Sequence, residues 1–172
     1  MCIRDRFGLA LDSMAIPAQS LVAGALGAGD PEEAMAVGRS SLKMSLWVAT
    51  AFCAVLAVSS PFVGALFSDD DAVVSRVLIG ALILAVLQIP GAIAFALDGV
   101  LIGGHDTKYL GRAAVFNLVP FVPALAVVIA FPSLGIAGLW AAVFIWMTTR
   151  ATVNYRRFVS QRWIVLEPQT VA

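Results

Sequence analysis

One apolar segment of 26 residues, Val77–Ile102, constrains the fold of this chain more than any other feature. Only two polar side chains, Gln88 and Asp98, interrupt it. A helix of about 20 mostly apolar residues is long enough to cross the hydrocarbon core of a bilayer. A carboxylate inside such a helix costs about 2.5–3.5 kcal/mol at the bilayer centre, so Asp98 is expected to have a partner or a function. The segment therefore predicts a membrane-spanning helix that contains an acid.

The composition places the whole chain in a membrane. Of its 172 residues, 60% are hydrophobic and only 13% are charged, whereas soluble domains carry about 25% charged residues. The formal net charge of zero gives no support for a nucleic-acid partner. Two cysteines, Cys2 and Cys53, do not indicate a disulfide framework. A single histidine, His105, leaves no spacing typical of a metal site, so neither a metal nor a bound cofactor is expected.

Four further segments have a similar length and character, and the sequence therefore predicts an all-α integral membrane protein with five membrane-spanning helices packed as one bundle. The predicted spans are Phe7–Leu26, Met44–Phe67, Val77–Ile102, Ala113–Phe131 and Leu134–Val153.

The chain is predicted to contain one domain with short additions at both ends. Residues 1–6, MCIRDR, do not share the pattern of the rest and resemble a translated sequencing-adapter sequence, so they are interpreted as a non-native scar. Residues 7–158 hold the five predicted helices without a long linker, and residues 159–172 are expected to form a cytosolic tail. On this interpretation an N-terminal part of the protein is missing.

Basic residues alternate between the predicted connections. The second loop holds Asp69, Asp70 and Asp71 with only Arg76, and the fourth loop carries no charge. Lysine and arginine are enriched on the cytoplasmic side of membrane proteins, which predicts a multi-pass protein of the inner (plasma) membrane with a cytosolic C-terminus. Eight basic residues lie on the predicted cytosolic side: Arg39, Lys43, Lys108, Arg112, Arg150, Arg156, Arg157 and Arg162.

Glycine and aspartate mark the expected ends of two helices. Gly29 is expected to end the first span and Asp30 to cap a short helix along the cytosolic surface. Gly103-Gly104 is expected to end the third span, and Asp106 to cap the next helix. Gly99 and Gly103 also form a small-xxx-small pattern, which is typical of closely packed membrane helices.

No nucleophile–base pair, phosphate loop or pair of catalytic carboxylates can be assembled from the sequence, so an enzyme is not expected. Polar side chains at membrane depth are instead the candidates for ion coupling or substrate binding. These are Asp12, Gln19, Gln88, Asp98 and Asn117.

Asp12 is the strongest candidate for a proton-linked step. It lies 14 residues before Leu26, roughly 21 Å along a helix from the cytosolic end. The alternative for Asp12 is a buried structural hydrogen bond. Gln19 follows two helical turns later on much the same face, and Asp12, Gln19 and Asn117 are expected to point into the bundle.

Asp98 lies only four residues before the cytosolic end of its span. It is expected to pair with Lys108 or Arg112 or to accept a backbone hydrogen bond at the inner mouth, and a gating role is the alternative. Gln88 and Asn117 are expected to form hydrogen bonds between helices rather than to bind ligands.

Two elements carry a resemblance to a known family. ALDSMAIPAQSLVAGALGAGD and, about 65 residues later, FALDGVLIGGHDTKYL resemble the C-terminal half of multidrug and toxic compound extrusion (MATE) transporters, more narrowly the branch of the DNA-damage-inducible protein F. The resemblance implies a twelve-helix fold of two six-helix lobes, of which this chain supplies helices eight to twelve.

The function implied by the resemblance is export of small, cationic, amphipathic drugs by antiport with protons or sodium through alternating access, with the N-terminal lobe as partner. In that branch the site of Gln19 is often acidic and the site of Gly24 is often glutamine, which shifts the weight of a proton mechanism to Asp12.

Two other functions stay open. A flippase of lipid-linked sugars from the same superfamily would hold a phosphate with cations at membrane depth, whereas the cations here are expected only at helix ends. A non-transporting membrane scaffold would have uniformly apolar spans without Asp12.

Overall fold

The computed structural model describes residues 3–65 and 69–164, with side chains from residue 15 to 63 and from 69 to 164. These residues form helices without any strand, which confirms the predicted all-α fold. The elements are α1 (Ile3–Gly27), α2 (Pro31–Ala65), α3 (Asp71–Gly103), α4 (Thr107–Phe116), α5 (Leu118–Ala130), a 3₁₀ turn η1 (Pro132–Leu134) and α6 (Gly135–Val159).

The long apolar helices account for four of the predicted spans. By length and composition, four described stretches could cross a membrane: Pro31–Val63, Asp71–Gly103, Thr107–Ala130 and Pro132–Val159. Helix α1 adds a shorter apolar stretch, Ala15–Gly27.

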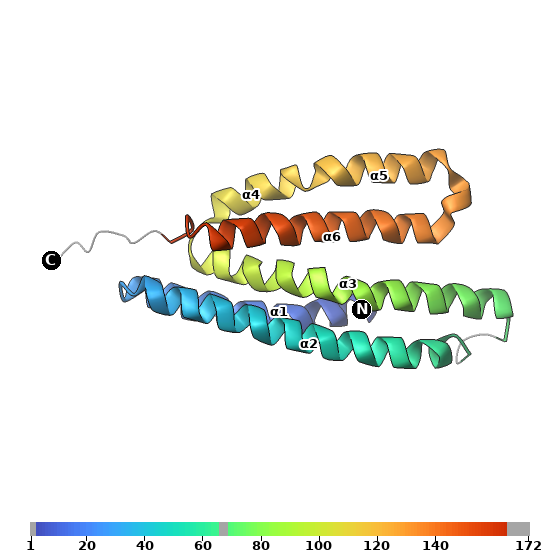
Figure 1. Cartoon of the computed structure of the whole chain (residues 1–172), viewed down its shortest axis with the longest axis horizontal. Coiled ribbons are helices and arrows are strands. Elements are labelled where there is room, and N and C mark those ends of the chain that lie inside the picture. The colour runs from blue at the N-terminus through green and yellow to red at the C-terminus, as the bar shows by residue number, and fades with distance from the viewer. Residues whose placement is uncertain (1–2, 66–68, 165–172) are drawn as a thin grey trace.

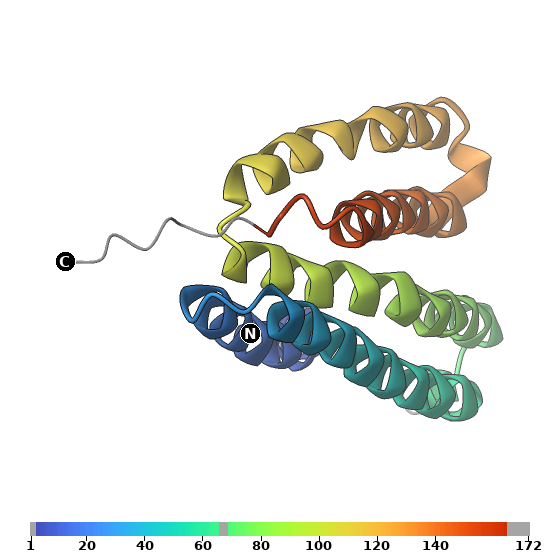
Figure 2. The same cartoon turned by 60° about the vertical axis from the view of Figure 1, so that its left-hand side comes forward.

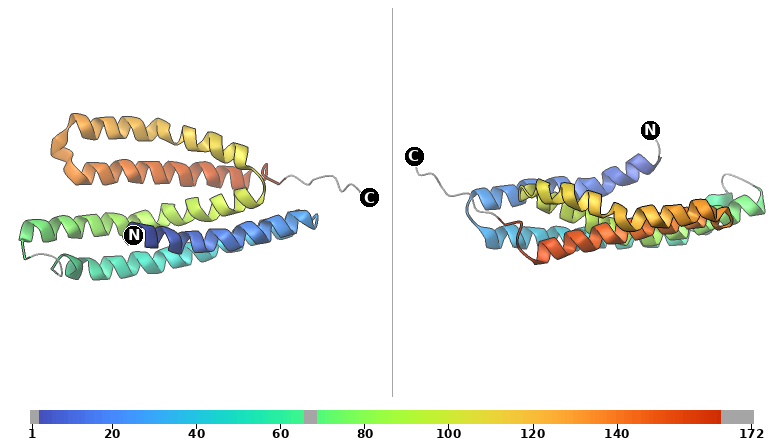
Figure 3. Two further views of the ribbon diagram at one scale, coloured as in Figure 1. Left: turned by 180° about the vertical axis from the view of Figure 1, so that it is seen from behind. Right: turned by 90° about the horizontal axis from the view of Figure 1, so that it is seen from above.

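Helix α3 lies at the centre of an open bundle. It packs against α1 and α2 on one side and against α6 on the other, while α5 packs mainly on α6. Helices α2, α3, α6 and α5 lie side by side in one layer, and α1 covers one face of that layer beside α2 and α3 (Figures 1 and 3). Figure 2 shows the α4–α5 segment and α6 as a hairpin on one side of α3.

Helix α2 differs from the prediction because it is continuous from Pro31 to Ala65, and the expected separate surface helix is wrong. Asp30 caps it as expected: the backbone N–H of Glu33 donates to Oδ1 of Asp30 at 2.9 Å. Ala34 and Met35 in the first turns are buried. The start of α2 therefore packs on the bundle instead of turning away along the membrane surface.

The predicted fourth span is divided at Asn117 into α4 and α5. Pro120 lies in the first turn of α5. A proline has no N–H for the carbonyl four residues earlier, and the first turn of a helix is where that loss is tolerated. Pro120 therefore favours a new helix start at this point.

Glycines allow α1 and α3 to approach closely. A Cβ on Gly99 would lie 2.4 Å from the carbonyl oxygen of Ala15, and one on Gly103 would lie 2.5 Å from that of Gln19. Small residues of this kind let membrane helices pack backbone to backbone. The predicted small-xxx-small face is therefore confirmed, and its partner is α1.

The chain folds back after α6. Gln161 has a left-handed backbone (φ 56°), and Trp163 is fully buried. The Trp163 ring stacks on Phe158 with centroids 5.9 Å apart, and its Nε1 donates to the Phe158 carbonyl at 3.1 Å. A Cβ on Gly104 would lie 2.6 Å from this indole. Trp163 thus joins the helices in one core beside the C-terminal end of α6, and this core also contains Ala18, Val22, Ala34, Met35, Leu97 and Leu101.

Gly99→Ala should destabilise the helix bundle, because the new methyl group meets backbone that cannot move independently. Overpacking of this kind costs about 1–3 kcal/mol. Gly80→Ala, in the same helix, is the matched control, since its Cβ would meet only Trp140 Nε1 at 3.8 Å. Thermal unfolding in detergent measures both variants. Equal midpoints would contradict the close approach of α1 and α3.

Replacing Trp163 should be far more damaging than replacing Trp47, which is 77% exposed. Trp163→Ala removes a buried indole, which costs about 3–5 kcal/mol. Trp47→Ala changes a surface position, where effects stay within about 0.5 kcal/mol. Unfolding of the two variants in the same detergent compares their stabilities. Similar losses of stability would show that the core around Trp163 does not hold the helices together.

Candidate functional site: an aromatic-lined ion pair between α3 and α6

Asp98 of α3 is held by two side chains of α6. An Nη atom of Arg150 donates to Oδ2 of Asp98 in a salt bridge, and Nδ2 of Asn154 donates to Oδ1 at 2.7 Å. Arg150 and Asn154 are four residues apart and therefore lie on one face of α6. The side chains of Asp98 and Arg150 are 15% and 26% exposed. Both carboxylate oxygens of Asp98 thus contact α6.

Aromatic rings surround the arginine of this pair. The guanidinium carbon of Arg150 lies 5.3 Å from the centroid of the Phe95 ring and 6.0 Å from that of Trp146. Trp146 in turn contacts Phe121 of α5, with centroids 5.9 Å apart. The faces of aromatic rings attract cations within about 6 Å. The positive charge of Arg150 is therefore stabilised by one carboxylate and two rings.

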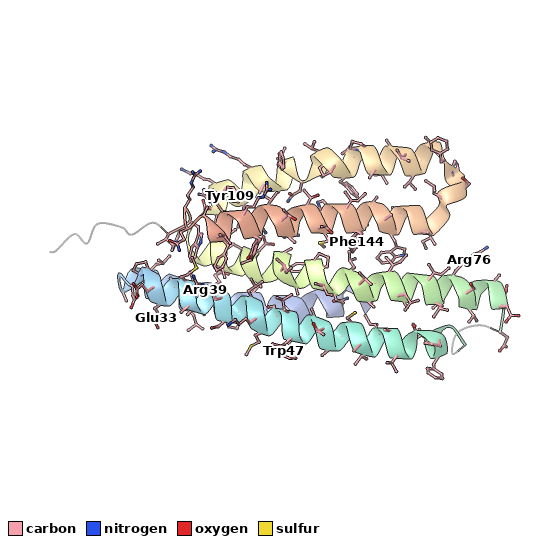
Figure 4. The ribbon with its side chains drawn as sticks, viewed as in Figure 1. Glu33, Arg39, Trp47, Arg76, Tyr109 and Phe144 are labelled. Atoms are coloured by element: carbon pink, nitrogen blue, oxygen red, sulfur yellow. The ribbon has the colours of Figure 1, made fainter. Side chains whose placement is uncertain are left out.

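A second ion pair lies two helical turns closer to the C-terminal end of α6. Arg157 donates to Oδ2 of Asp106 at 2.6 Å and to the carbonyl of Arg162 at 3.2 Å. Its guanidinium lies 4.6 Å from the ring centroid of Tyr109, whose hydroxyl donates to the Val153 carbonyl at 3.1 Å. Figure 4 labels Tyr109 at this end of the molecule. The two pairs together hold the C-terminal half of α6 against α3 and against the turn between α3 and α4.

Two predicted partners are wrong. Asp98 was expected to pair with Lys108 or Arg112, but both are exposed on α4, and α3 packs its acid against α6 instead. Asp106 occupies the N-cap position of α4, but the structure shows no cap hydrogen bond from its side chain. Its carboxylate accepts from Arg157, because α6 presents a guanidinium at this turn.

The other candidates do not gather around Asp98. Gln88 is buried but lies ten residues earlier on α3, about 15 Å along the helix. Asn117 is buried as expected, and its Oδ1 has no hydrogen-bond partner among the described residues. Gln19 is exposed rather than turned inward, because α1 packs Ala18, Val22 and Ala25 into the core. Asp12 lies in α1, but its side chain is outside the described residues.

Arg150 and Asn154 were missed by sequence reasoning. Arg150 was counted only among the basic residues of the predicted cytosolic side, although α6 continues for nine residues beyond it to Val159. The available signal was the spacing of a cation and an amide four residues apart in a mostly apolar helix. Over the residues with described side chains, no group of three or more histidine, cysteine, aspartate or glutamate side chains could hold a metal ion.

Asp98→Asn and Arg150→Met should show coupled effects on stability. Each single change leaves a partly buried polar group without its charged partner, whereas the double variant removes the pair. A double-mutant cycle for contacting residues gives a coupling of about 0.5–3 kcal/mol. The control cycle combines Asp98→Asn with Arg76→Met at an exposed site, where effects should add. Additive effects in the first cycle would show that the ion pair does not contribute to stability.

Comparison with known proteins assigns the family. The MatE family model matches residues 6–128. The chain is 34% identical over 142 residues to Protein DETOXIFICATION 44, chloroplastic, of Arabidopsis thaliana, covering 83% of this chain and 27% of that protein. It is 30% identical over 149 residues to Protein DETOXIFICATION 42 of the same plant, covering 87% of this chain and 28% of the relative.

A human relative gives the same assignment. The chain is 30% identical over 152 residues to Multidrug and toxin extrusion protein 1 of Homo sapiens, covering 86% of this chain and 26% of that protein. The chain thus spans about a quarter of the length of the curated relatives it matches. With its long apolar helices, it is a multi-pass membrane protein that belongs to the MatE family.

Proposed function

We propose that this chain is part of a secondary active transporter that exports organic cations or drugs by antiport with protons or sodium. The observation that carries the proposal is the family match over residues 6–128, together with a relative named for multidrug and toxin extrusion. The chain spans about a quarter of such relatives. The transport cycle is therefore proposed for a longer protein, in which a second lobe faces these helices and the substrate lies between the lobes.

Asp12 is proposed to carry the ion-coupled step. A carboxylate away from water is stable when protonated, whereas the ionised form needs a cation, a hydrogen-bond donor or water. The two forms can stabilise inward-facing and outward-facing conformations differently, and only such a difference drives a cycle. Gln19, on the same helix, is exposed in this chain, which supports a cavity or a further lobe along this side of α1.

Asp98 is proposed as a second, gating acid that affects the rate rather than the coupling. Arg150 neutralises its charge and ties α3 to α6. Loss of this link should change how α6 moves relative to α3, while the pH dependence of transport should persist because it arises at Asp12.

The chemistry of Arg150 favours antiport over a lipid-linked sugar flippase. Arg150 lies inside α6 rather than at its end, so a cation is present within the helix. Its charge, however, is balanced by Asp98 rather than presented to a phosphate. A flippase site would need a cation that a phosphate can reach without first breaking an ion pair.

The distribution of charge supports a plasma-membrane protein with a cytosolic C-terminus. Figure 4 labels Arg39 near the end where α6 terminates and Arg76 at the opposite end. The remaining basic residues of the loops and of the C-terminal segment gather with Arg39 rather than Arg76. Excess lysine and arginine mark the cytoplasmic side.

Transport in liposomes tests the proposal. The 172-residue chain alone should show no gradient-driven flux of ethidium, whereas a longer family protein that contains these helices should export it. In that longer protein Asp12→Asn should abolish gradient-dependent flux while substrate binding persists. Asp30→Asn is the control, since Asp30 only caps α2. Flux with an unchanged pH profile in Asp12→Asn would place the coupling elsewhere, and strong flux by the short chain would contradict the need for a second lobe.

A further inference from the structure

The environment of Arg150 has the composition of a cation-binding site. We propose that Phe95, Asp98, Trp146 and Asn154, here called the cation cluster, bind a monovalent organic cation, and that Arg150 occupies this site as a tethered competitor. This proposal says where an exported cation binds and that it displaces Arg150. Its biological role rests on the proposed export of cations.

The geometry favours a cation over other ligands. Oδ2 of Asp98 accepts from the guanidinium of Arg150, and Oδ1 accepts from Nδ2 of Asn154 at 2.7 Å. The carboxylate is therefore fixed in orientation. The rings of Phe95 and Trp146 lie 5.3 and 6.0 Å from the positive carbon. A carboxylate combined with aromatic faces also suits quaternary ammonium groups, which bind to aromatic rings without needing hydrogen bonds.

Exchange of Arg150 for an external cation keeps the charge of the site balanced. Before and after exchange, one positive charge neutralises Asp98, so no additional charge is buried. The side chains of Arg150 and Asp98 are 26% and 15% exposed, so neither is enclosed on all sides. The free-energy difference between the two states is therefore set by the competition between two cations for the same carboxylate.

The exchange would have a structural consequence. The Asp98–Arg150 pair links the middle of α6 to α3, whereas the Asp106–Arg157 pair holds the end of α6. A bound cation would release the first link and leave the second intact. Cation binding would thus loosen α6 from α3 without detaching its cytosolic end.

Binding of radiolabelled tetraethylammonium to the purified 172-residue chain in detergent tests the proposal by equilibrium dialysis. If Arg150 occupies the site at least nine-tenths of the time, its removal should strengthen apparent binding by about tenfold or more. Arg150→Gln should therefore bind more tightly than the wild type, and Arg150→Lys, which keeps a tethered cation, should bind like the wild type. Arg76→Gln removes one positive charge at an exposed site and should change nothing.

The Asp98 and Trp146 variants locate the bound cation. Asp98→Asn should abolish binding both alone and with Arg150→Gln, and Trp146→Leu should weaken it at least threefold. Equal affinity of Arg150→Gln and the wild type, or binding that survives Asp98→Asn, would overturn the proposal. Helicity and a monodisperse elution profile establish folding of each variant. If Arg150→Gln does not fold, the Asp98→Asn and Trp146→Leu variants still test the proposal, because each should reduce the binding measured for the wild type.

The outcome is separable from that of the transport assay, because binding needs neither a gradient nor a second lobe. Binding without transport by a longer family protein would contradict only the proposed function. Transport without binding at the cation cluster would contradict only this inference.

Discussion

Close packing of small residues along α3 is the constraint on which the rest of this structure depends. Lipid chains are as apolar as leucine, so membrane helices gain little from the hydrophobic effect when they associate. Close backbone approach replaces that gain, and α3 provides it through Gly99 and Gly103 against α1. Its buried alanines also allow neighbouring helices to approach closely; they include Ala85, Ala92, Ala94 and Ala96. A helix with large side chains at these positions could not be the centre of the bundle.

The other side of α3 uses a different chemistry. The Asp98–Arg150 ion pair joins α6 to α3, and the Asp106–Arg157 pair joins α6 to the turn after α3. Few side chains of the span that contains α6 are buried. Ion pairs are directional, whereas apolar contacts permit sliding. One bundle therefore contains a closely packed side, α1–α2–α3, and a side where α6 combines apolar packing at its C-terminal end with directional polar contacts. Such a division suits the alternating access proposed for the longer protein.

The features that depend on neighbouring residues could be predicted from the sequence. The Asp30 cap involves residues only three apart, and the glycine pattern on α3 repeats at one helical turn. The partner of Asp98 depends on which helix packs beside α3, and Arg150 is 52 residues away, so local spacing favoured Lys108 and Arg112 wrongly. The exposure of Gln19 likewise depends on which side of α1 its neighbours cover. Whether Asp12 couples transport to an ion stays a prediction.

The Asp98–Arg150 pair also bears on how the protein enters the membrane. Each side chain alone opposes insertion of its helix, by a cost that reaches about 2.5–3.5 kcal/mol at the bilayer centre and is smaller near a helix end. Asp98 is synthesised 52 residues before Arg150, which at 5–20 residues per second is a delay of roughly 3–10 s. During that interval the acid of α3 is not yet matched by α6. The arrival of α6 then gives both charged side chains a partner, so each helix stabilises the other in the bilayer.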